Sequence, residues 1–284
     1  MSEKTKVAQS VKFFKKNFPG FRPKALLVLG TGLGELRGSL EPGESLAYHE
    51  IPHFPRSTVK GHTGSLCFCR TNGLDLAVLR GRVHAYEGYS SQEVVRTIRV
   101  IRLLGAETAV LTNAAGSLNP LFDQGSIMCI SDHINLTGEN PLIGQDVQEW
   151  GPLFPDMSRV YCPNLRNMVQ KAALRLGFVL NTGVYVGIKG PSLETPAETR
   201  AFRNLGGDAI GMSTVLEVIA ARHMGMGILG LSCLTNKNLP DCMAETSHEE
   251  ILEAAGNINK QLSRLLQDFF SSLSRQLQGL ENDI

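Results

Sequence analysis

Ala-Leu-Leu-Val-Leu-Gly-Thr-Gly-Leu-Gly, residues 25–34, joins five apolar residues to a loop that contains three glycines. An apolar run of this length suits a buried strand. Glycines that follow a strand let the backbone approach an anion closely. We therefore predict a strand at Ala25–Leu29 followed by a loop that cradles one phosphate, although a plain tight turn would also explain the glycines.

Short apolar runs of the same kind alternate with segments of helical periodicity along the chain. Further strands are predicted at Leu66–Arg70, Leu74–Leu79, Thr108–Thr112, Ile127–Ile130, Thr182–Ile188, Ala209–Ile210 and Gly227–Leu234. Helices are predicted around residues 7–18 and at Ser91–Leu104, Asn164–Leu176, Pro196–Asn204, Val215–Met224 and His248–Leu273. This alternation predicts one α/β domain, residues 1–284, in which helices flank a central mixed, largely buried sheet. The last helix is expected to pack on its own domain, with a coiled coil as the alternative.

The composition argues against several classes of protein. A formal net charge of +1 predicts no broad attraction to nucleic acid or to a membrane surface. No apolar run approaches the roughly 20 residues that a membrane span needs. The six cysteines form no CxxC pair, so we expect reduced, mostly buried thiols in a reducing compartment and no metal site. The apolar residues at 7–18 recur at helical spacing among lysines, unlike a signal peptide, so we expect a cytoplasmic location.

Four predicted helix starts carry a Ser or Thr followed three residues later by Glu. In such a capping box the first side chain accepts from a backbone N–H and the glutamate reaches back. The boxes begin at Ser90, Thr195, Thr214 and Ser247. They place Glu194, Ser213 and His248 at or beside helix N-termini, where anions and binding groups often gather.

Residues 49–53, His-Glu-Ile-Pro-His, match the letters of the HExxH zinc-protease motif. That motif needs a helix so that both histidines face one metal. Pro52 would remove a backbone donor and clash inside such a helix. We predict an extended loop with surface histidines instead.

Residues 81–88, Gly-Arg-Val-His-Ala-Tyr-Glu-Gly, follow another predicted strand. If this segment is extended, Arg82, His84 and Tyr86 share one face. A planar guanidinium suits a pair of phosphate oxygens, so these residues predict part of an anion site rather than a solvated strand end. Residues 113–116, Asn-Ala-Ala-Gly, also end a predicted strand, and their small side chains would expose backbone N–H groups, although a simple turn explains them almost as well.

Together, and in order, these motifs resemble the trimeric type of purine nucleoside phosphorylase, a family that also includes methylthioadenosine phosphorylases. The resemblance implies a phosphorylase/hydrolase-like α/β fold with a partly barrel-like sheet. The matching segments are GTGLG at 30–34, IPHFPRSTVKGHTG at 51–64, GRVHAYEG at 81–88, NAAG at 113–116, GPSLETPAE at 190–198, GMSTVLE at 211–217, TNK at 235–237 and SHEE at 247–250.

The resemblance implies a role for each matching residue. Phosphate would be held by Thr31, Arg82, His84, Ser213 and the backbone N–H of Ala114, with His62 close by. Ribose would contact Tyr86, Met212 and His248, and Phe154 would reach into the ribose site of a neighbouring subunit in a homotrimer. The purine would be read by Glu194 and Asn236 and lined by Ala115, Gly116, Leu193, Ile210 and Gly211. Glu194, Asn236 and His84 are the implied catalytic residues, inorganic phosphate is the co-substrate, and no cofactor is required.

Asn236 also bears on the choice of substrate, because adenine-acting members of the family carry aspartate at that position. We therefore expect inosine and guanosine as substrates, and Leu193, where relatives have an aromatic residue, leaves xanthosine open. Methylthioadenosine phosphorylase is the alternative within the family. A nicotinamide-dependent oxidoreductase is disfavoured because Glu35 replaces the third glycine of its fingerprint. A non-catalytic nucleoside binder would not need the second, anion-binding set of residues.

Overall fold

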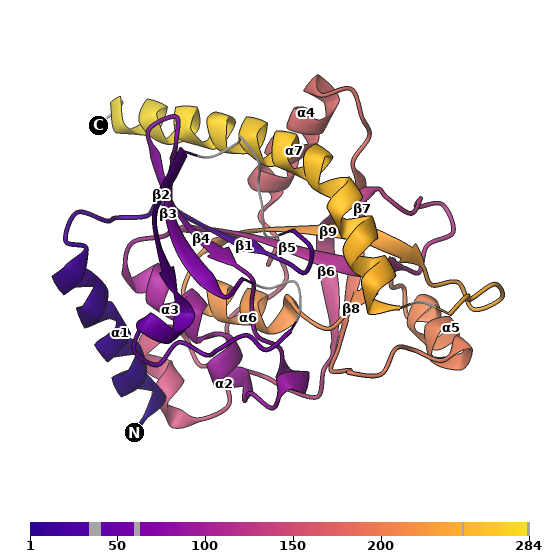
Figure 1. The fold of residues 1–284 in the computed structure, drawn as a ribbon, viewed down its shortest axis with the longest axis horizontal. Helices are drawn as coiled ribbons and strands as arrows, with labels where there is room; N and C mark the ends of the chain where they lie inside the picture. Colours follow the sequence, from indigo (N-terminus) through magenta and orange to yellow (C-terminus); the bar gives the residue numbers. More distant parts are fainter. Residues whose placement is uncertain (34–40, 60–62, 246, 283–284) are drawn as a thin grey trace.

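The computed structural model describes residues 1–33, 41–59, 63–245 and 247–282. Its α-helices are α1 (Glu3–Asn17), α2 (Ser91–Val94), α3 (Arg96–Leu103), α4 (Pro163–Arg175), α5 (Pro196–Asn204), α6 (Val215–His223) and α7 (His248–Asn282) (Figure 1). Its strands are β1 (Ala25–Leu29), β2 (Glu41–Ala47), β3 (Ser65–Thr71), β4 (Leu74–Arg80), β5 (Thr108–Ser117), β6 (Ile127–Leu136), β7 (Asn181–Ile188), β8 (Ala209–Gly211) and β9 (Gly227–Lys237). Short 3-10 helices lie at Tyr48–Glu50, Ala85–Glu87 and Gln145–Trp150.

Within the described residues the strands form one mixed sheet in the order β2-β3-β4-β1-β5-β8-β7-β6-β9. β1 runs parallel to β4 and β5, whereas β2, β3 and β4 pair antiparallel. β5 also pairs with β9, which closes β5, β8, β7, β6 and β9 into a barrel-like ring. The predicted α/β fold with a mixed, partly barrel-like sheet is confirmed.

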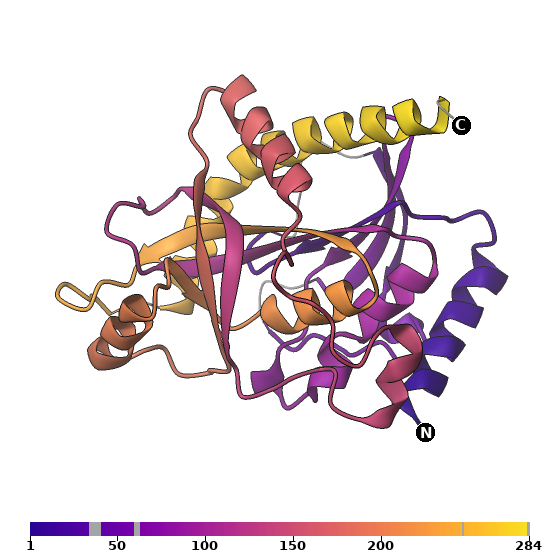
Figure 2. The same cartoon turned by 180° about the vertical axis from the view of Figure 1, so that it is seen from behind.

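β1 is buried on both faces, as parallel central strands usually are. Leu26 and Val28 pack into a core shared with α1, α3 and α6, while Leu27 and Leu29 pack into a second core under α4 and α7. Figures 1 and 2 show these two groups of helices on opposite sides of the sheet. Because side chains alternate along a strand, the five apolar residues serve both layers at once.

Most predicted helices lie within a few residues of their expected bounds, and one of them is divided into two. Residues 91–104 form two helices, α2 and α3, and Val95 (φ −96°, ψ 0°) is a turn residue between them. α7 is longer than predicted, and its apolar stripe, which includes Ile258, Leu262 and Leu265, is buried in its own core. The prediction that this helix packs on its own domain is confirmed.

β2 was not predicted, because Pro42 and Gly43 obscure its strand pattern. β2 lies at the edge of the sheet, where proline is tolerated. The backbone of β3 passes very close to Gly43: a Cβ atom there would lie 2.1 Å from the carbonyl oxygen of Phe68. Glycine is therefore required by a close approach of two strands and does not mark a turn.

The expectation of an extended loop at His49–His53 was wrong. Tyr48–Glu50 is a 3-10 helix, and His53 has a positive φ of 64°. His49 is exposed, whereas His53 is half-buried with Nε2 2.5 Å from Oε1 of Gln9. Among the described residues, no group of three or more His, Cys, Asp or Glu side chains is placed to hold a metal.

The structure also shows where the cysteines lie and whether any helix could span a membrane. Cys67, Cys69, Cys129 and Cys233 are buried, in agreement with the expectation that most of the cysteines are buried. No helix in the described ranges is both long enough and apolar enough to span a membrane.

Candidate active site

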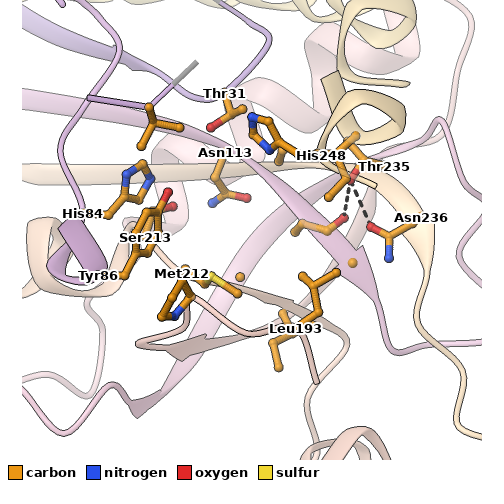
Figure 3. A pocket seen from close by; sticks show the side chains of 18 of the residues that line it. Thr31, His84, Tyr86, Asn113, Leu193, Met212, Ser213, Thr235, Asn236 and His248 are labelled. Carbon is orange, nitrogen blue, oxygen red and sulfur yellow. Dashed lines mark hydrogen bonds between the residues drawn. The ribbon is translucent and has the colours of Figure 1, made fainter. Parts of the chain in front are cut away.

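A cavity of about 430 Å³ opens where the loops after β1 and β4 meet β5, β8 and the end of β9 (Figure 3). The loop before α5 and the first residues of α7 complete its wall. This is the side of the parallel strands on which α/β proteins usually bind ligands, beyond the carboxyl ends. The predicted residues that line it are Thr31, Arg82, His84, Tyr86, Ala114, Ala115, Gly116, Leu193, Glu194, Ile210, Gly211, Met212, Ser213, Asn236 and His248.

Two predicted site residues are not in this set. His62 lies outside the described residues. Phe154 does not line the cavity and is 88% exposed on the surface. Phe154 therefore does not contribute to the cavity of its own chain, and its role in a neighbouring subunit stays a prediction.

Arg82 forms the buried cationic wall of the cavity. Its side chain is 4% exposed, its Nε lies 3.1 Å from Oε1 of Glu217, and its Nη1 donates to the carbonyl oxygen of Thr112 at 2.6 Å. Glu217 lies in the first turn of α6, and its Oε2 accepts from the backbone N–H of Thr214 at 3.2 Å. One carboxylate thus fixes both the guanidinium and the start of a helix.

Replacing Glu217 with alanine should therefore lower the free energy of unfolding by about 3–5 kcal/mol, because the buried charge of Arg82 loses its anionic partner. Urea denaturation of the variant measures this loss. Glu198→Ala is the matched control: its carboxylate completes the exposed capping box of α5, and its loss should cost about 1 kcal/mol. Similar losses for the two variants would contradict a structural role for the buried ion pair.

His84 is held on one side by a carboxylate and on the other by a ring. Its Nδ1 lies 3.0 Å from Oε1 of Glu87, and its ring stacks on Tyr86 with centroids 4.6 Å apart. Burial raises the pKa of Glu87, but hydrogen bonds from His84 and Thr58 outweigh it and bring that pKa to about 2. An ionised carboxylate only accepts, so Nδ1 of His84 carries a proton and the ring orientation is fixed.

Residues 81–88 were considered as an extended segment, but only part of this segment is extended. Ala85–Glu87 is a 3-10 helix, so Tyr86 does not continue the alternation that begins at Arg82. All three side chains nonetheless reach the cavity, because the helical turn brings Tyr86 beneath the His84 ring. Stacking, and not a shared strand face, brings Tyr86 and His84 together.

Ser213 is presented by a strained turn. Thr214 has φ 69° and ψ −49°, and the backbone N–H of Val215 donates to the carbonyl oxygen of Ser213 at 2.7 Å. This is the rare γ-turn geometry, and a non-glycine residue in it costs roughly 1–3 kcal/mol. Nδ2 of Asn113 donates to Oγ1 of Thr214 at 2.9 Å, which helps to hold the turn. The turn places Ser213 in the cavity wall at the N-terminus of α6, beside His84 (Figure 3).

Part of one edge of β5 faces the cavity. Its ladder with β1 ends at Leu111, and its ladder with β8 begins only at Gly116. The backbone between these points, including Ala114, is paired on the β9 side and faces the cavity on the other. Residues 113–116 therefore lie inside a strand, not at its end as predicted, and the expected exposure of backbone groups comes from the interrupted ladder.

Asn236 lies at the opposite end of the cavity from His84 (Figure 3). It is part of β9, whereas the sequence placed it just beyond the strand. Oγ1 of Thr235 lies 3.1 Å from Oδ1 of Asn236 and 3.3 Å from the carbonyl oxygen of Ala115. Because the hydroxyl engages the amide oxygen, the Nδ2 group of Asn236 is left as the donor available to a ligand.

Glu194 lies one residue before Thr195, the N-cap of α5, as predicted. Its Oε2 accepts from Nδ2 of Asn238 at 2.5 Å. Burial raises the pKa of Glu194, although hydrogen bonds from its own backbone N–H and from Asn238 lower it. The neighbouring Leu193 is 51% exposed and lines the same cavity. This end of the cavity therefore offers amide donors beside a carboxylate acceptor.

A family profile described as the phosphorylase superfamily matches residues 24–271. A purine nucleoside phosphorylase 1 from Geobacillus stearothermophilus is 42% identical over 272 residues, covering 96% of this chain and 99% of the relative. A purine nucleoside phosphorylase from Bos taurus is 46% identical over 259 residues, covering 89% and 88% respectively. This chain belongs to the purine nucleoside phosphorylase family of the phosphorylase superfamily.

Solved structures lead to the same family. A purine nucleoside phosphorylase from Schistosoma mansoni in complex with adenosine matches with a TM-score of 0.88 and 34% identity, over 94% of this chain and 96% of that one. A Schistosoma purine nucleoside phosphorylase in complex with hypoxanthine matches equally well at 33% identity. The present chain is thus a pentosyltransferase of this family.

Sequence reasoning missed several residues that line the cavity of this family member. They are Val59, Asn113, Pro191, Thr235, Asn238 and Ile251. A signal for Asn238 did exist, because residues two apart in an extended segment share a face, and Asn236 was already assigned to the site. Val59, Asn113, Pro191 and Thr235 lie within the matching segments, but no role was assigned to them. Ile251 is apolar, and nothing local distinguishes a residue of the cavity wall from a core residue there.

Proposed function

We propose that this cavity catalyses the reversible phosphorolysis of 6-oxopurine ribonucleosides and deoxyribonucleosides. Inosine and guanosine are the expected substrates, and the products are the free base and ribose 1-phosphate or its deoxy counterpart. The observation that carries the proposal is the arrangement at the base end, where Thr235 engages the oxygen of Asn236 while Glu194 supplies an acceptor nearby. The proposal includes a cytoplasmic role in purine salvage.

The two base-reading groups match a 6-oxopurine edge. The Asn236 amide can donate to N7 and O6, which are both acceptors. Ionised Glu194 can accept from N1–H and from the 2-amino group of guanine. Adenine reverses this pattern, with a donor at position 6 and an acceptor at N1. Mismatched buried polar groups can reject a substrate by roughly 10⁴ or more, which favours inosine and guanosine over adenosine and methylthioadenosine.

The chemical step needs no covalent enzyme intermediate. A phosphate oxygen attacks C1′ as the C1′–N9 bond breaks, and the ribose passes through an oxocarbenium-like state. The bonding electrons move onto the purine, where the donors of Asn236 meet the developing negative charge. One preorganised group of this kind typically contributes roughly 3 kcal/mol to transition-state stabilisation, and holding both reactants in place contributes a further large share.

The opposite end of the cavity suits the phosphate. Arg82 supplies a permanent cation, Ser213 and Thr31 supply hydroxyl groups, and Ala114 lies on the open edge of β5. The start of α6 adds the partial positive charge of a helix N-terminus beside Ser213. His84 completes this set with a ring whose orientation Glu87 fixes.

Between the two ends, Tyr86, Met212 and His248 would contact the ribose. Phe154 would complete this region from a neighbouring subunit, which makes a homotrimer part of the proposal. Its 88% exposure supports this assignment, since a large apolar side chain is then available for burial in an interface.

A substrate panel tests the proposal. Inosine, guanosine, xanthosine and adenosine are each incubated with the protein, with and without phosphate, and base release is followed by chromatography. Turnover, not binding, is the useful readout, because a related phosphorylase has been crystallised with adenosine. We expect phosphate-dependent release from inosine and guanosine, and release from none of the four nucleosides would overturn the proposal.

Replacing Arg82 with alanine should raise the phosphate KM by roughly 100-fold while changing the nucleoside KM far less. A charge-assisted hydrogen bond contributes about 1.5–3 kcal/mol, and the variant loses the cation of the phosphate site. Initial rates at varied phosphate and fixed inosine, and the reverse, separate the two constants. Arg82→Lys keeps the charge and should recover part of the phosphate affinity, provided that both variants melt above the assay temperature. Equal effects on the two KM values would mean that phosphate binds elsewhere.

A further inference from the structure

Asn238 links two walls of the cavity that are far apart in sequence. It follows β9, whereas Glu194 precedes α5, and Nδ2 of Asn238 donates to Oε2 of Glu194 at 2.5 Å. Asn238 is 5% exposed and lines the cavity beside the carboxylate. The bond is therefore a partly buried, charge-assisted contact at the base end of the site.

The Asn238 side chain is not needed to hold its own backbone. The backbone N–H of Asn238 donates to the carbonyl oxygen of Ser117 at 2.8 Å, which extends the pairing between β9 and β5. The neighbouring Gly116 gives room to the first side-chain carbon of Asn238, since a Cβ atom at residue 116 would lie 3.2 Å from Cβ of Asn238. The backbone thus fixes the position of Asn238 and leaves its amide to act on Glu194.

We propose that Asn238 is a positioning and specificity-determining residue, whose amide keeps the Glu194 carboxylate aimed and available as the acceptor for the N1–H edge of a 6-oxopurine. This inference rests on the proposed base-reading role of Glu194. It adds a third polar residue to the pair that reads the base.

The electrostatics around Glu194 support this role. Burial and the charge of Glu198 on α5 both raise the pKa of Glu194, whereas Asn238 and the backbone N–H of Glu194 lower it. His248, at the start of α7, is the titratable group that faces the same cavity from that helix. Without the Asn238 donor, the Glu194 pKa rises further, and the protonated carboxyl presents a hydrogen to N1–H where an acceptor is needed.

The direction of the pH effect on the nucleoside KM follows from the ionisation of Glu194. Base recognition needs ionised Glu194, so the nucleoside KM rises as the pH falls through the Glu194 pKa. We call this rise of the nucleoside KM at low pH the acid limb of the pH profile. Asn238→Leu should move the acid limb toward higher pH by about one unit, since one charge-assisted hydrogen bond to Glu194 is lost. Asn238→Asp should move it further, because a second carboxylate raises the Glu194 pKa by like-charge repulsion.

The test measures kcat and KM for inosine and guanosine from acid to alkaline pH in Asn238→Leu, Asn238→Asp and the unchanged protein. At neutral pH, Asn238→Leu should raise the nucleoside KM roughly tenfold or more, with little change in kcat or in the phosphate KM. Asn238→Ser, which restores a shorter donor, should recover part of the loss. Asn204→Leu, on the exposed C-terminal end of α5, is the matched control and should leave all constants unchanged.

The outcomes separate this inference from the proposed function. If the unchanged protein cleaves no nucleoside, the proposed function fails. If it cleaves inosine but Asn238→Leu shows the same KM and the same acid limb, the positioning role of Asn238 is wrong. A loss in kcat and thermal stability with an unmoved acid limb would also overturn it, because that pattern marks a purely structural residue.

Discussion

Replacing Glu194 with alanine is expected to lower kcat/KM for inosine and guanosine by roughly 10³-fold. The variant removes the carboxylate acceptor for N1–H and leaves the Asn238 amide without its anionic partner at the base end of the cavity. The lost contacts are those from the base, N1–H and, in guanine, the 2-amino group, and charge-assisted hydrogen bonds contribute about 1.5–3 kcal/mol each. Steady-state kinetics at saturating phosphate measures it.

Two further variants sharpen that result. Glu194→Gln keeps the shape and one acceptor oxygen, so its loss should be smaller than that of Glu194→Ala. Glu198→Ala removes a nearby carboxylate that caps α5 but does not line the cavity, and it should keep kcat/KM within a few-fold of the unchanged protein. A Glu194→Ala variant as active as Glu198→Ala would remove Glu194 from base recognition.

The exchange of Asn236 for aspartate is expected to shift the preference toward 6-aminopurines. The amide donor is lost, and the carboxylate that replaces it accepts from a 6-amino group and repels the 6-oxo group. The ratio of kcat/KM for adenosine to that for inosine should rise by roughly 10² or more, since a mismatched buried polar contact strongly disfavours a substrate. Parallel kinetics with the two nucleosides give this ratio.

Asn236→Ala is the matched control for the aspartate variant. It removes the donor without adding an acceptor, so inosine cleavage should fall with no gain in the adenosine ratio. Thr235→Val should act in the same direction as Asn236→Ala but more weakly, because the amide of Asn236 loses the hydroxyl that orients its oxygen. An unchanged ratio in Asn236→Asp would refute the assignment of Asn236 as the reader of position 6.

The sheet was largely predictable because most of its strands begin with short apolar runs. Ala25–Leu29 was placed to the residue, since all five side chains are buried and a glycine follows. Pro42 and Gly43 made β2 invisible, because an edge strand that needs a close backbone approach carries residues that ordinarily mark turns. The predictions also stopped short of the polar ends of β5, β6 and β9. β6 extends to Leu136, six residues beyond its predicted end, and β5 and β9 continue into the cavity wall.

The site was predictable as a set of residues but not as an arrangement. The motifs named the residues, yet only the structure shows that a γ-turn at Thr214 presents Ser213 and that Glu217 joins Arg82 to α6. The bond between Asn238 and Glu194 joins residues 44 positions apart, and no local pattern predicts a contact between the end of β9 and the loop before α5.

The central claim is that the cavity joins phosphate to the ribose as it releases the base. Phosphorus-31 NMR of the unchanged protein with inosine and inorganic phosphate tests this claim most directly. We expect the phosphate signal to fall as a ribose 1-phosphate signal rises, in a one-to-one ratio with the hypoxanthine released. Release of hypoxanthine with free ribose and an unchanged phosphate signal would show hydrolysis and contradict the account.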